Sequence, residues 1–162
     1  MKIVYDAIKN FILTDMENPL KEMETKEGEF PLPDAKNIIY GTADLTRNEA
    51  KILVAVVPDS VKEDTGSLDS GVIEGNVVIC FAFRGLAYST LMERMETYAA
   101  AFRMALRSNP SLSWAVMNVD LGKTEYFPDA GATHGTMTVA EVEVTVRVTE
   151  KKADGIDPFS DF

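Results

Sequence analysis

The sequence holds one histidine and one cysteine, the residue types best suited to act as a base or a nucleophile near neutral pH. His134 lies in the glycine-containing segment 131–136, and Cys80 lies in the apolar run 77–81. Nucleophilic catalysis needs a base beside the nucleophile and a third group that orients the base. No nucleophile elbow accompanies His134, and the run around Cys80 predicts a buried, unreactive thiol. We therefore expect a solvent-facing loop histidine and a chain that is not an enzyme.

Ligands for metals and phosphates are also sparse. A zinc site needs several Cys and His ligands, and the chain has one of each. One acidic segment offers carboxylates for calcium, at Asp59, Glu63, Asp64 and Asp69. Their spacing does not match an EF-hand loop, and neither GxxxxGK[ST] nor GxGxxG occurs in the chain. We expect no metal and no cofactor.

Aromatic residues in polar surroundings suggest contacts with a partner instead. Tyr126 and Phe127 lie in a segment, 122–136, that glycine and proline residues punctuate and that we interpret as a long loop. Phe159 and Phe162 lie in a polar, acidic tail. Apolar anchors on polar segments are typical of parts that become ordered on a partner. The alternative is that these four side chains fold back onto their own domain.

Size and charge narrow the class of protein. A chain of 162 residues has the usual length of one domain, and we expect residues 1–150 to form it and residues 151–162 to form an acidic C-terminal tail. The net charge of −10 argues against binding to a phosphate backbone, which depends on clustered Lys and Arg. No apolar run approaches the roughly 20 residues of a membrane span, so we expect no membrane contact. The single cysteine favours a reducing compartment.

The first part of the chain predicts a helix followed by a linker. Apolar residues recur at helical spacing over residues 2–16, namely at Ile3, Val4, Ile8, Phe11 and Ile12. We expect Pro19 to end this helix, because the residue before a proline avoids the helical conformation. Residues 19–36 are polar and contain two further prolines, which indicates a surface linker.

The middle of the chain predicts three strands and a long loop. Short strands are expected at 37–41 and 52–57, with Pro58 closing the second. Residues 58–76 show no periodicity and are interpreted as a loop. The apolar run 77–83 is rich in β-branched and aromatic residues, which favours a central strand covered on both faces.

The last part predicts a long helix and two more strands. A stripe with steps of three and four marks the helix, at Tyr88, Leu91, Met95, Tyr98, Phe102, Ala105 and Leu106. Residues 114–121 are interpreted as a strand. The valines of 139–149 alternate with polar residues, as in a half-buried strand. An alternative role for this last strand is that of a sheet edge whose free main-chain groups pair with a neighbour. The order of elements predicts an α+β fold: an antiparallel sheet of about four to five strands, with one long helix and an N-terminal helix packed on it.

This layout resembles the tail-terminator and head–tail completion (neck) proteins of tailed bacteriophages. The shared pattern is an N-terminal helix, strands that carry a long loop, the apolar strand 77–83, the long helix 88–107, a strand that begins near Trp114 and the alternating strand 139–149. The resemblance covers roughly residues 1–150, and it is one of architecture and segment order, with no diagnostic motif.

The resemblance implies a structural, non-enzymatic virion protein that is assembled in the cytoplasm of the bacterial host. Members of this family form rings, often hexamers, between the tail tube and the connector of the head. Its partners would be copies of itself, tail-tube proteins and connector proteins, with DNA passing through the lumen without specific binding. An acidic lumen would repel DNA. Two alternative hypotheses remain. The chain could be a different tail-tube, neck or baseplate adaptor protein, or a small ligand-binding or enzymatic α+β domain.

Overall fold

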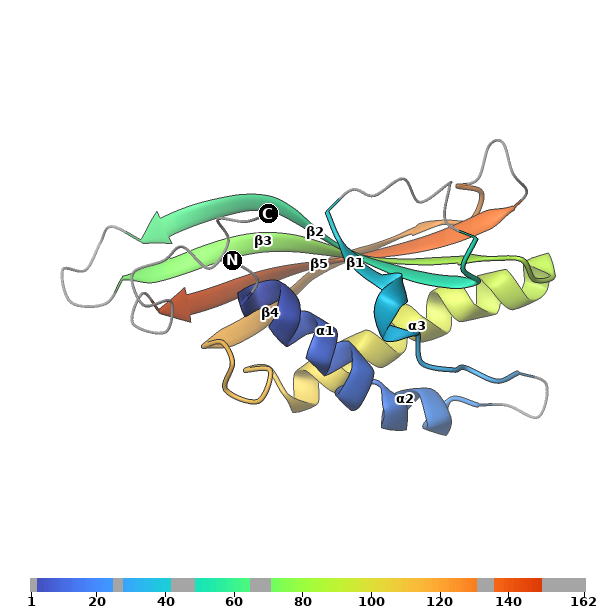
Figure 1. Ribbon diagram of the computed structural model, residues 1–162, viewed down its shortest axis with the longest axis horizontal. Coiled ribbons are helices and arrows are strands. Elements are labelled where there is room, and N and C mark those ends of the chain that lie inside the picture. The colour runs from blue at the N-terminus through green and yellow to red at the C-terminus, as the bar shows by residue number, and fades with distance from the viewer. Residues whose placement is uncertain (1–2, 25–27, 42–48, 65–70, 131–135, 150–162) are drawn as a thin grey trace.

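The computed structural model describes residues 3–24, 28–41, 49–64, 71–130 and 136–149. His134, Phe159, Phe162 and the predicted tail lie outside these residues, as does Asp69. Within them the chain forms a five-stranded sheet with its helices on one face, so the predicted α+β fold is confirmed (Figure 1).

The sheet has the strand order β1-β2-β3-β5-β4. Its strands are β1 (Ile38–Tyr40), β2 (Ile52–Asp64), β3 (Val72–Arg84), β4 (Asn118–Phe127) and β5 (Met137–Thr149). All neighbours pair antiparallel except β1, which runs parallel to β2. The alternating valine strand β5 lies between β3 and β4, so the prediction that it could be an edge is wrong. Among the described strands, β1 and β4 are the edges.

The strands β2 and β3 are much longer than their apolar centres predict. β2 continues beyond Pro58, and the register shifts between Pro58 and Ser60, which makes a β-bulge. The pairing of β1 with β2 ends at Val56, so the missing N–H of Pro58 falls where no described strand needs it. Most of the predicted loop 58–76 is therefore strand: its second half pairs with both β2 and β5, and its polar side chains lie on the face of the sheet opposite the helices.

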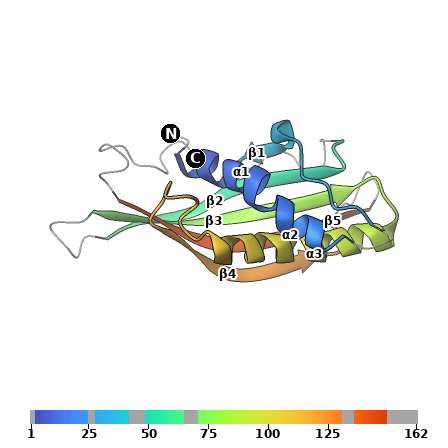
Figure 2. The same cartoon turned by 90° about the horizontal axis from the view of Figure 1, so that it is seen from below.

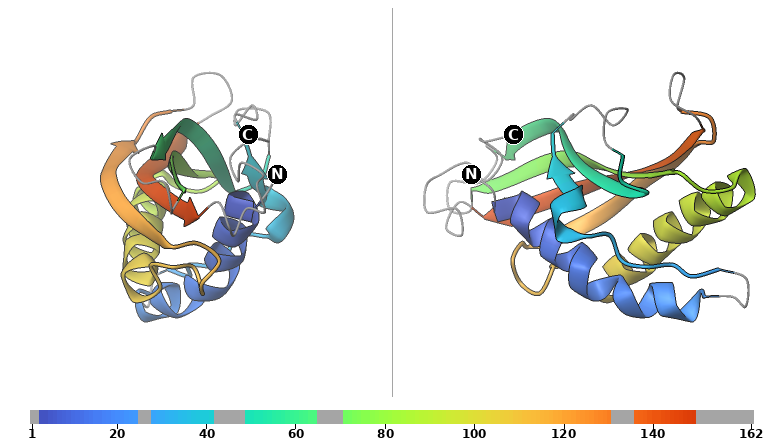
Figure 3. Two further views of the ribbon diagram at one scale, coloured as in Figure 1. Left: turned by 90° about the vertical axis from the view of Figure 1, so that its left-hand side faces the viewer. Right: turned by 45° about the vertical axis from the view of Figure 1, so that its right-hand side comes forward.

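Helices α1 (Ile3–Asp15), α2 (Glu17–Glu22) and α3 (Tyr88–Ser108) lie on one face of the sheet, which the end-on view shows most clearly (Figure 3, left). Pro19 does not end the first helix. It lies in the first turn of α2, where proline is tolerated because the N–H groups there have no helical partner. The predicted linker 19–36 thus begins with a helical turn, and a short 3₁₀ helix, η1 (Ala35–Asn37), follows near its end.

The main core fills the space between α3, α1 and the sheet (Figure 2). On the sheet side it includes the buried valines of β5, at positions 142, 144, 146 and 148. On the helix side the Phe102 ring packs edge-on against Phe11, with 5.5 Å between the ring centroids. The predicted helix stripe is confirmed apart from its first residue, Tyr88, which is 52% exposed.

The opposite face of the sheet holds a smaller apolar cluster at one end. It consists of Leu53, Ala55, Cys80, Ala82, Met137 and Val139. In β3, Ile79 to Phe83 are all buried, although successive side chains point to opposite faces. The prediction of a central strand covered on both faces is therefore confirmed.

Candidate interaction surface

The edge strand β4 carries two of the predicted contact residues. Tyr126 and Phe127 are the last two residues of β4, where they pair with Ala140 and Val139 of β5, so the prediction that they lie in a loop is wrong. Gly122 begins no loop: the register shifts between Leu121 and Thr124, and β4 continues beyond the shift.

Glycine is favoured at this shift because the two strands approach closely. A Cβ atom at Gly122 would lie 3.1 Å from the Cβ of Glu143 and 3.2 Å from its carbonyl oxygen. The glycine that marks a loop by composition here marks a bulge.

Tyr126 and Phe127 point to opposite faces of the sheet, as successive strand residues must. Arg103 of α3 donates from Nη1 to Thr124 Oγ1 at 2.9 Å and reaches the Tyr126 hydroxyl at 3.5 Å. The two aromatic side chains remain 41% and 38% exposed, respectively. They are thus half packed on their own domain, and their role as partner contacts stays a prediction.

The connection between α3 and β4 differs from the strand predicted for residues 114–121. Leu112, Ser113 and Trp114 all have positive φ angles, of 49°, 57° and 68°. Left-handed backbone costs an L-residue roughly 1–2 kcal/mol. The chain adopts it because Leu112 and Val116 are both buried in the core, which forces the chain to reverse between them. Strand β4 begins only at Asn118.

Hydrogen bonds fix this turn from several sides. Asn109 Oδ1 accepts from the Ser113 amide at 2.8 Å, and Asn109 Nδ2 donates to Asp15 Oδ2 at 2.6 Å. The Trp114 amide donates to Ser111 Oγ at 3.1 Å. Strained backbone persists where the surroundings over-determine it, and such positions cluster at functional sites.

The turn presents Trp114 to solvent with 80% of its surface exposed. Seven large apolar side chains are exposed in the described residues, and four of them lie between residues 114 and 127: Trp114, Met117, Tyr126 and Phe127. We call these four residues the β4-edge cluster. The sequence prediction named two of them and missed Trp114 and Met117. A usable signal was the absence of any Asp, Glu, Lys or Arg between Arg107 and Asp120.

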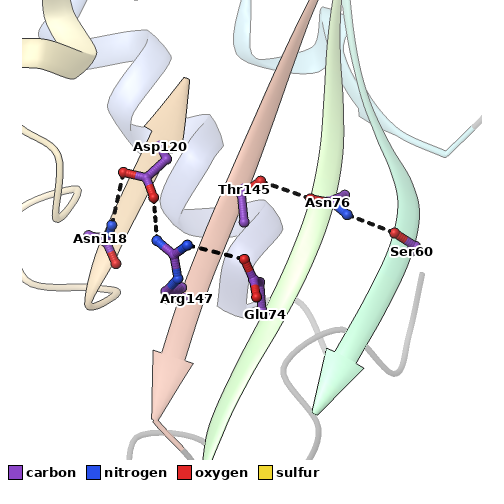
Figure 4. Close-up of polar contacts among 7 residues, drawn as sticks. All are labelled: Ser60, Glu74, Asn76, Asn118, Asp120, Thr145 and Arg147. Atoms are coloured by element: carbon purple, nitrogen blue, oxygen red, sulfur yellow. Dashed lines mark hydrogen bonds and ion pairs between the residues drawn. The ribbon is translucent and has the colours of Figure 1, made fainter. Parts of the chain in front are cut away.

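A polar network on the face opposite the helices ties β4 to the rest of the sheet (Figure 4). Arg147 of β5 forms ion pairs with Asp120 of β4 and, at 3.2 Å, with Glu74 of β3. The hydrogen bond from Arg147 to Asp120 raises the pKa of the Arg147 guanidinium above its ordinary value. These contacts hold the edge strand in a fixed register.

On the same face, a separate set of hydrogen bonds joins Asn76 of β3 to its two neighbouring strands. Its amide oxygen accepts from Thr145 of β5 at 2.8 Å, and its nitrogen donates to Ser60 of β2 at 2.9 Å. Together, the two sets of contacts involve side chains of four strands, β2, β3, β5 and β4.

Three carboxylates lie close together between the apolar and polar parts of this face, those of Glu125, Glu141 and Glu143. Lys123 forms an ion pair with Glu125 and lies 3.9 Å from a carboxylate oxygen of Glu143. Partial burial raises the pKa of Glu141, and the charges of Glu125 and Glu143 raise it further. The described residues contain no group of three or more His, Cys, Asp or Glu side chains placed to hold a metal ion.

Cys80 is buried, as predicted, and belongs to the smaller apolar cluster on the face of the sheet opposite the helices. Burial raises the pKa of its thiol to about 12, and the nearby charge of Glu141 acts in the same direction. The thiol is therefore protonated at neutral pH and is a poor nucleophile.

Two open grooves mark the described surface. The first, of about 520 Å³, lies between segment 31–37 and the start of β2. The second, of about 570 Å³, lies between the α1–α2 junction and the last turns of α3. None of the described helices is long and apolar enough to cross a membrane.

Comparisons with known proteins give a distant likeness. No protein-family model matches the chain, and no curated protein matches it. Among solved structures, the chain is similar to one from the virion of a native gene transfer agent (GTA) particle, with a TM-score of 0.41 and 13% sequence identity. The likeness covers 68% of this chain and 78% of that chain.

Proposed function

We propose that this chain is a non-enzymatic structural subunit of a tailed-phage virion or a prophage-derived particle, acting as a ring-forming tail terminator or head–tail joining protein. The observation that carries the proposal is the exposure of the β4-edge cluster, of which Trp114 and Met117 lie just before the edge strand β4 and Tyr126 and Phe127 lie at its end. Aromatic residues and methionine are enriched where proteins contact one another.

The edge strand suits a contact between subunits in two ways. Its unpaired side can accept a strand or a loop of a neighbour through main-chain hydrogen bonds. The ion pairs of Arg147 with Asp120 and Glu74 link side chains of the edge strand to β5 and β3, in addition to the main-chain pairing. The segment order that resembles tail-terminator and neck proteins supports the same role.

The charge of the chain suits a ring through which DNA passes. A subunit with a net charge of −10 repeated around a ring gathers negative charge, and like charges repel the phosphate backbone. The lumen is therefore proposed to be acidic, and the partners are proposed to be further copies of this chain, tail-tube proteins and connector proteins. A ring whose lumen proves neutral or basic would overturn this part of the proposal.

The test uses the purified full chain in sedimentation velocity and negative-stain electron microscopy. We expect a closed ring with a fixed number of copies, with six favoured by the resemblance. Open-ended tubes would favour a tail-tube protein instead. A chain that stays monomeric at all accessible concentrations contradicts the proposed function.

A pair of variants tests the β4-edge cluster itself. Phe127→Lys places a charge at the proposed contact and is expected to abolish the ring. Val61→Lys is the matched control, because Val61 is an exposed apolar residue of β2, which β3 and β5 separate from β4, and it should leave the ring intact. Equal behaviour of the two variants, with both folded by thermal melting, would contradict a contact through this edge.

A further inference from the structure

Part of the sheet face opposite the helices is buried, although no described helix covers it. The smaller apolar cluster lies there, and each of its six residues is at most 6% exposed. Helices α1, α2 and α3 all lie on the other face (Figure 3, left). Among the described apolar residues that pack against this cluster, only Ala130 lies outside the strands. An apolar sheet face is buried only beneath another layer, so the cluster needs a cover that the described helices do not provide.

The cluster is part of a continuous apolar surface, because its members lie beside one another in register. Leu53 of β2 pairs with Ala82 of β3, and Ala82 pairs with Val139 of β5. Val139 pairs in turn with Phe127 of β4, which is 38% exposed. Toward the other end, the same face carries polar side chains (Figure 4), including those of Glu74, Asn76, Thr145 and Arg147.

The C-terminal segment 150–162, the tail, starts at the polar end of this face and is long enough to reach the apolar end. Strand β5 ends at Thr149. Glu141, which pairs with Cys80, lies roughly 27 Å from Thr149 along the strand. Ten residues of extended chain span at most about 33–36 Å, so Phe159 can lie at the level of Cys80.

The order of polarity along the tail matches that of the face. Residues 150–155 contain no large apolar side chain, and the large apolar residues of the tail follow them, at Ile156, Phe159 and Phe162. A tail that runs back along the face from Thr149 places its polar half over polar side chains and its aromatic end over the smaller apolar cluster. Such a contact buries apolar surface and leaves the charged groups near water, which avoids the cost of burying a charge.

Three other segments outside the described ranges connect strands of the sheet, and their sequences fit less well. Residues 65–70 connect the ends of β2 and β3 that lie farthest from the cluster. Residues 131–135 contain no large apolar side chain. Residues 42–48 contain one, Leu45. The tail contains three, so Leu45 is the alternative against which the tail must be tested.

We propose that the tail folds back over the sheet face opposite the helices, and that Phe159 and Phe162 cover the smaller apolar cluster of their own chain. The two aromatic residues are then anchors within the molecule and not contacts with a partner. The contact forms within a single chain, so it does not depend on the proposed ring.

Cys80 is the only cysteine of the chain and belongs to the cluster, so the rate at which its thiol is labelled by a maleimide reports the cover. In the full chain with both Phe159→Ser and Phe162→Ser, we expect labelling to be at least ~10-fold faster, because a buried thiol reacts only when its cover opens. Leu45→Ser is the matched control and should leave the rate close to that of the unaltered chain.

An unchanged rate in the tail variant overturns the inference, and a raised rate in Leu45→Ser alone would assign the cover to residues 42–48. Thermal melts followed by circular dichroism show whether each variant is folded, so that faster labelling is attributed to loss of the cover and not to unfolding.

Cross-linking tests whether the tail and the cluster belong to the same chain. Phe159→Cys places a second thiol beside Cys80, and oxidation by copper phenanthroline should join the two in a disulfide within one chain. Ser160→Cys is the matched control, because neighbouring residues of an extended segment point in opposite directions. A disulfide between two chains would show that the tail covers a neighbouring copy, which overturns the assignment to the same chain. Equal yields from the two variants contradict the contact.

Discussion

Phe102 and Trp114 are aromatic residues in neighbouring elements with opposite environments. Phe102 is 2% exposed and contacts the rings of Phe11 and Phe81, whereas Trp114 is 80% exposed on left-handed backbone. Burial of Phe102 contributes to the free energy of folding. The left-handed backbone of Trp114 costs free energy, which the rest of the fold must offset. The contrast teaches that a residue that stabilises the fold and a residue that we propose for contact with a partner are separate along this connection, so they can be changed separately.

The largest effect is expected in the core. Phe102→Ala removes a ring packed between Phe11 and Phe81 and should lower the free energy of unfolding by about 3–5 kcal/mol. Tyr88→Ala on the same helix removes an exposed ring and should change it by less than about 0.5 kcal/mol. Urea unfolding followed by circular dichroism measures both. Similar losses for the two variants would show that the core does not depend on this ring.

A smaller effect is expected at the hydrogen bonds that hold the turn. Asn109→Ala removes the acceptor of the Ser113 amide and the donor to Asp15, and should cost about 1–3 kcal/mol. It should also loosen the turn and change the surroundings of the exposed Trp114. Thermal melts and the fluorescence of Trp114 report the two consequences. A variant with lowered stability and unaltered assembly would show that the turn need not be rigid.

The smallest effect is expected at Glu141, where the sign depends on pH. Its pKa is raised in the folded chain, so the folded state holds the proton more tightly than the unfolded state does. The contribution of this residue therefore favours folding at low pH and is lost as pH rises through the folded-state pKa. Glu141→Gln should raise stability slightly at neutral pH and give no gain in acid. Thermal melts of both proteins from neutral to acid pH check this prediction. A gain in stability that is the same at every pH would contradict the mechanism.

The sequence predicts best those elements whose pattern follows from their own residues. The alternation of Val142 to Val148, the apolar run 77–83 and the stripe of α3 each identify a buried face without reference to the rest of the chain. The pattern of one segment does not show which strand it pairs with. That β5 lies between β3 and β4, rather than at an edge, follows from contacts between distant segments.

The irregular positions could not be predicted because local composition misleads there. Pro58 and Gly122 are ordinary signs of a loop, yet both lie within long strands where a register shift accommodates them. Residues 114–121 alternate like a strand, but the burial of Leu112 and Val116 forces a turn first. As a result, the sequence predicts a loop at Tyr126 and Phe127, which lie in a strand, and a strand at Trp114, which lies in a turn.

The position of β5 has a consequence for the order of events during synthesis. β5 is translated after both of its neighbours, so β3 keeps one unpaired side, and β4 has no described sheet partner, until residue 149 has left the ribosome. Pairings between distant segments also form slowly, because the intervening chain must be ordered first. The edge that we propose for contact with a neighbour thus comes into being only when the last strand has been inserted. Subunits would then meet as finished parts, and an incomplete chain would have no β4 edge with which to enter a growing ring.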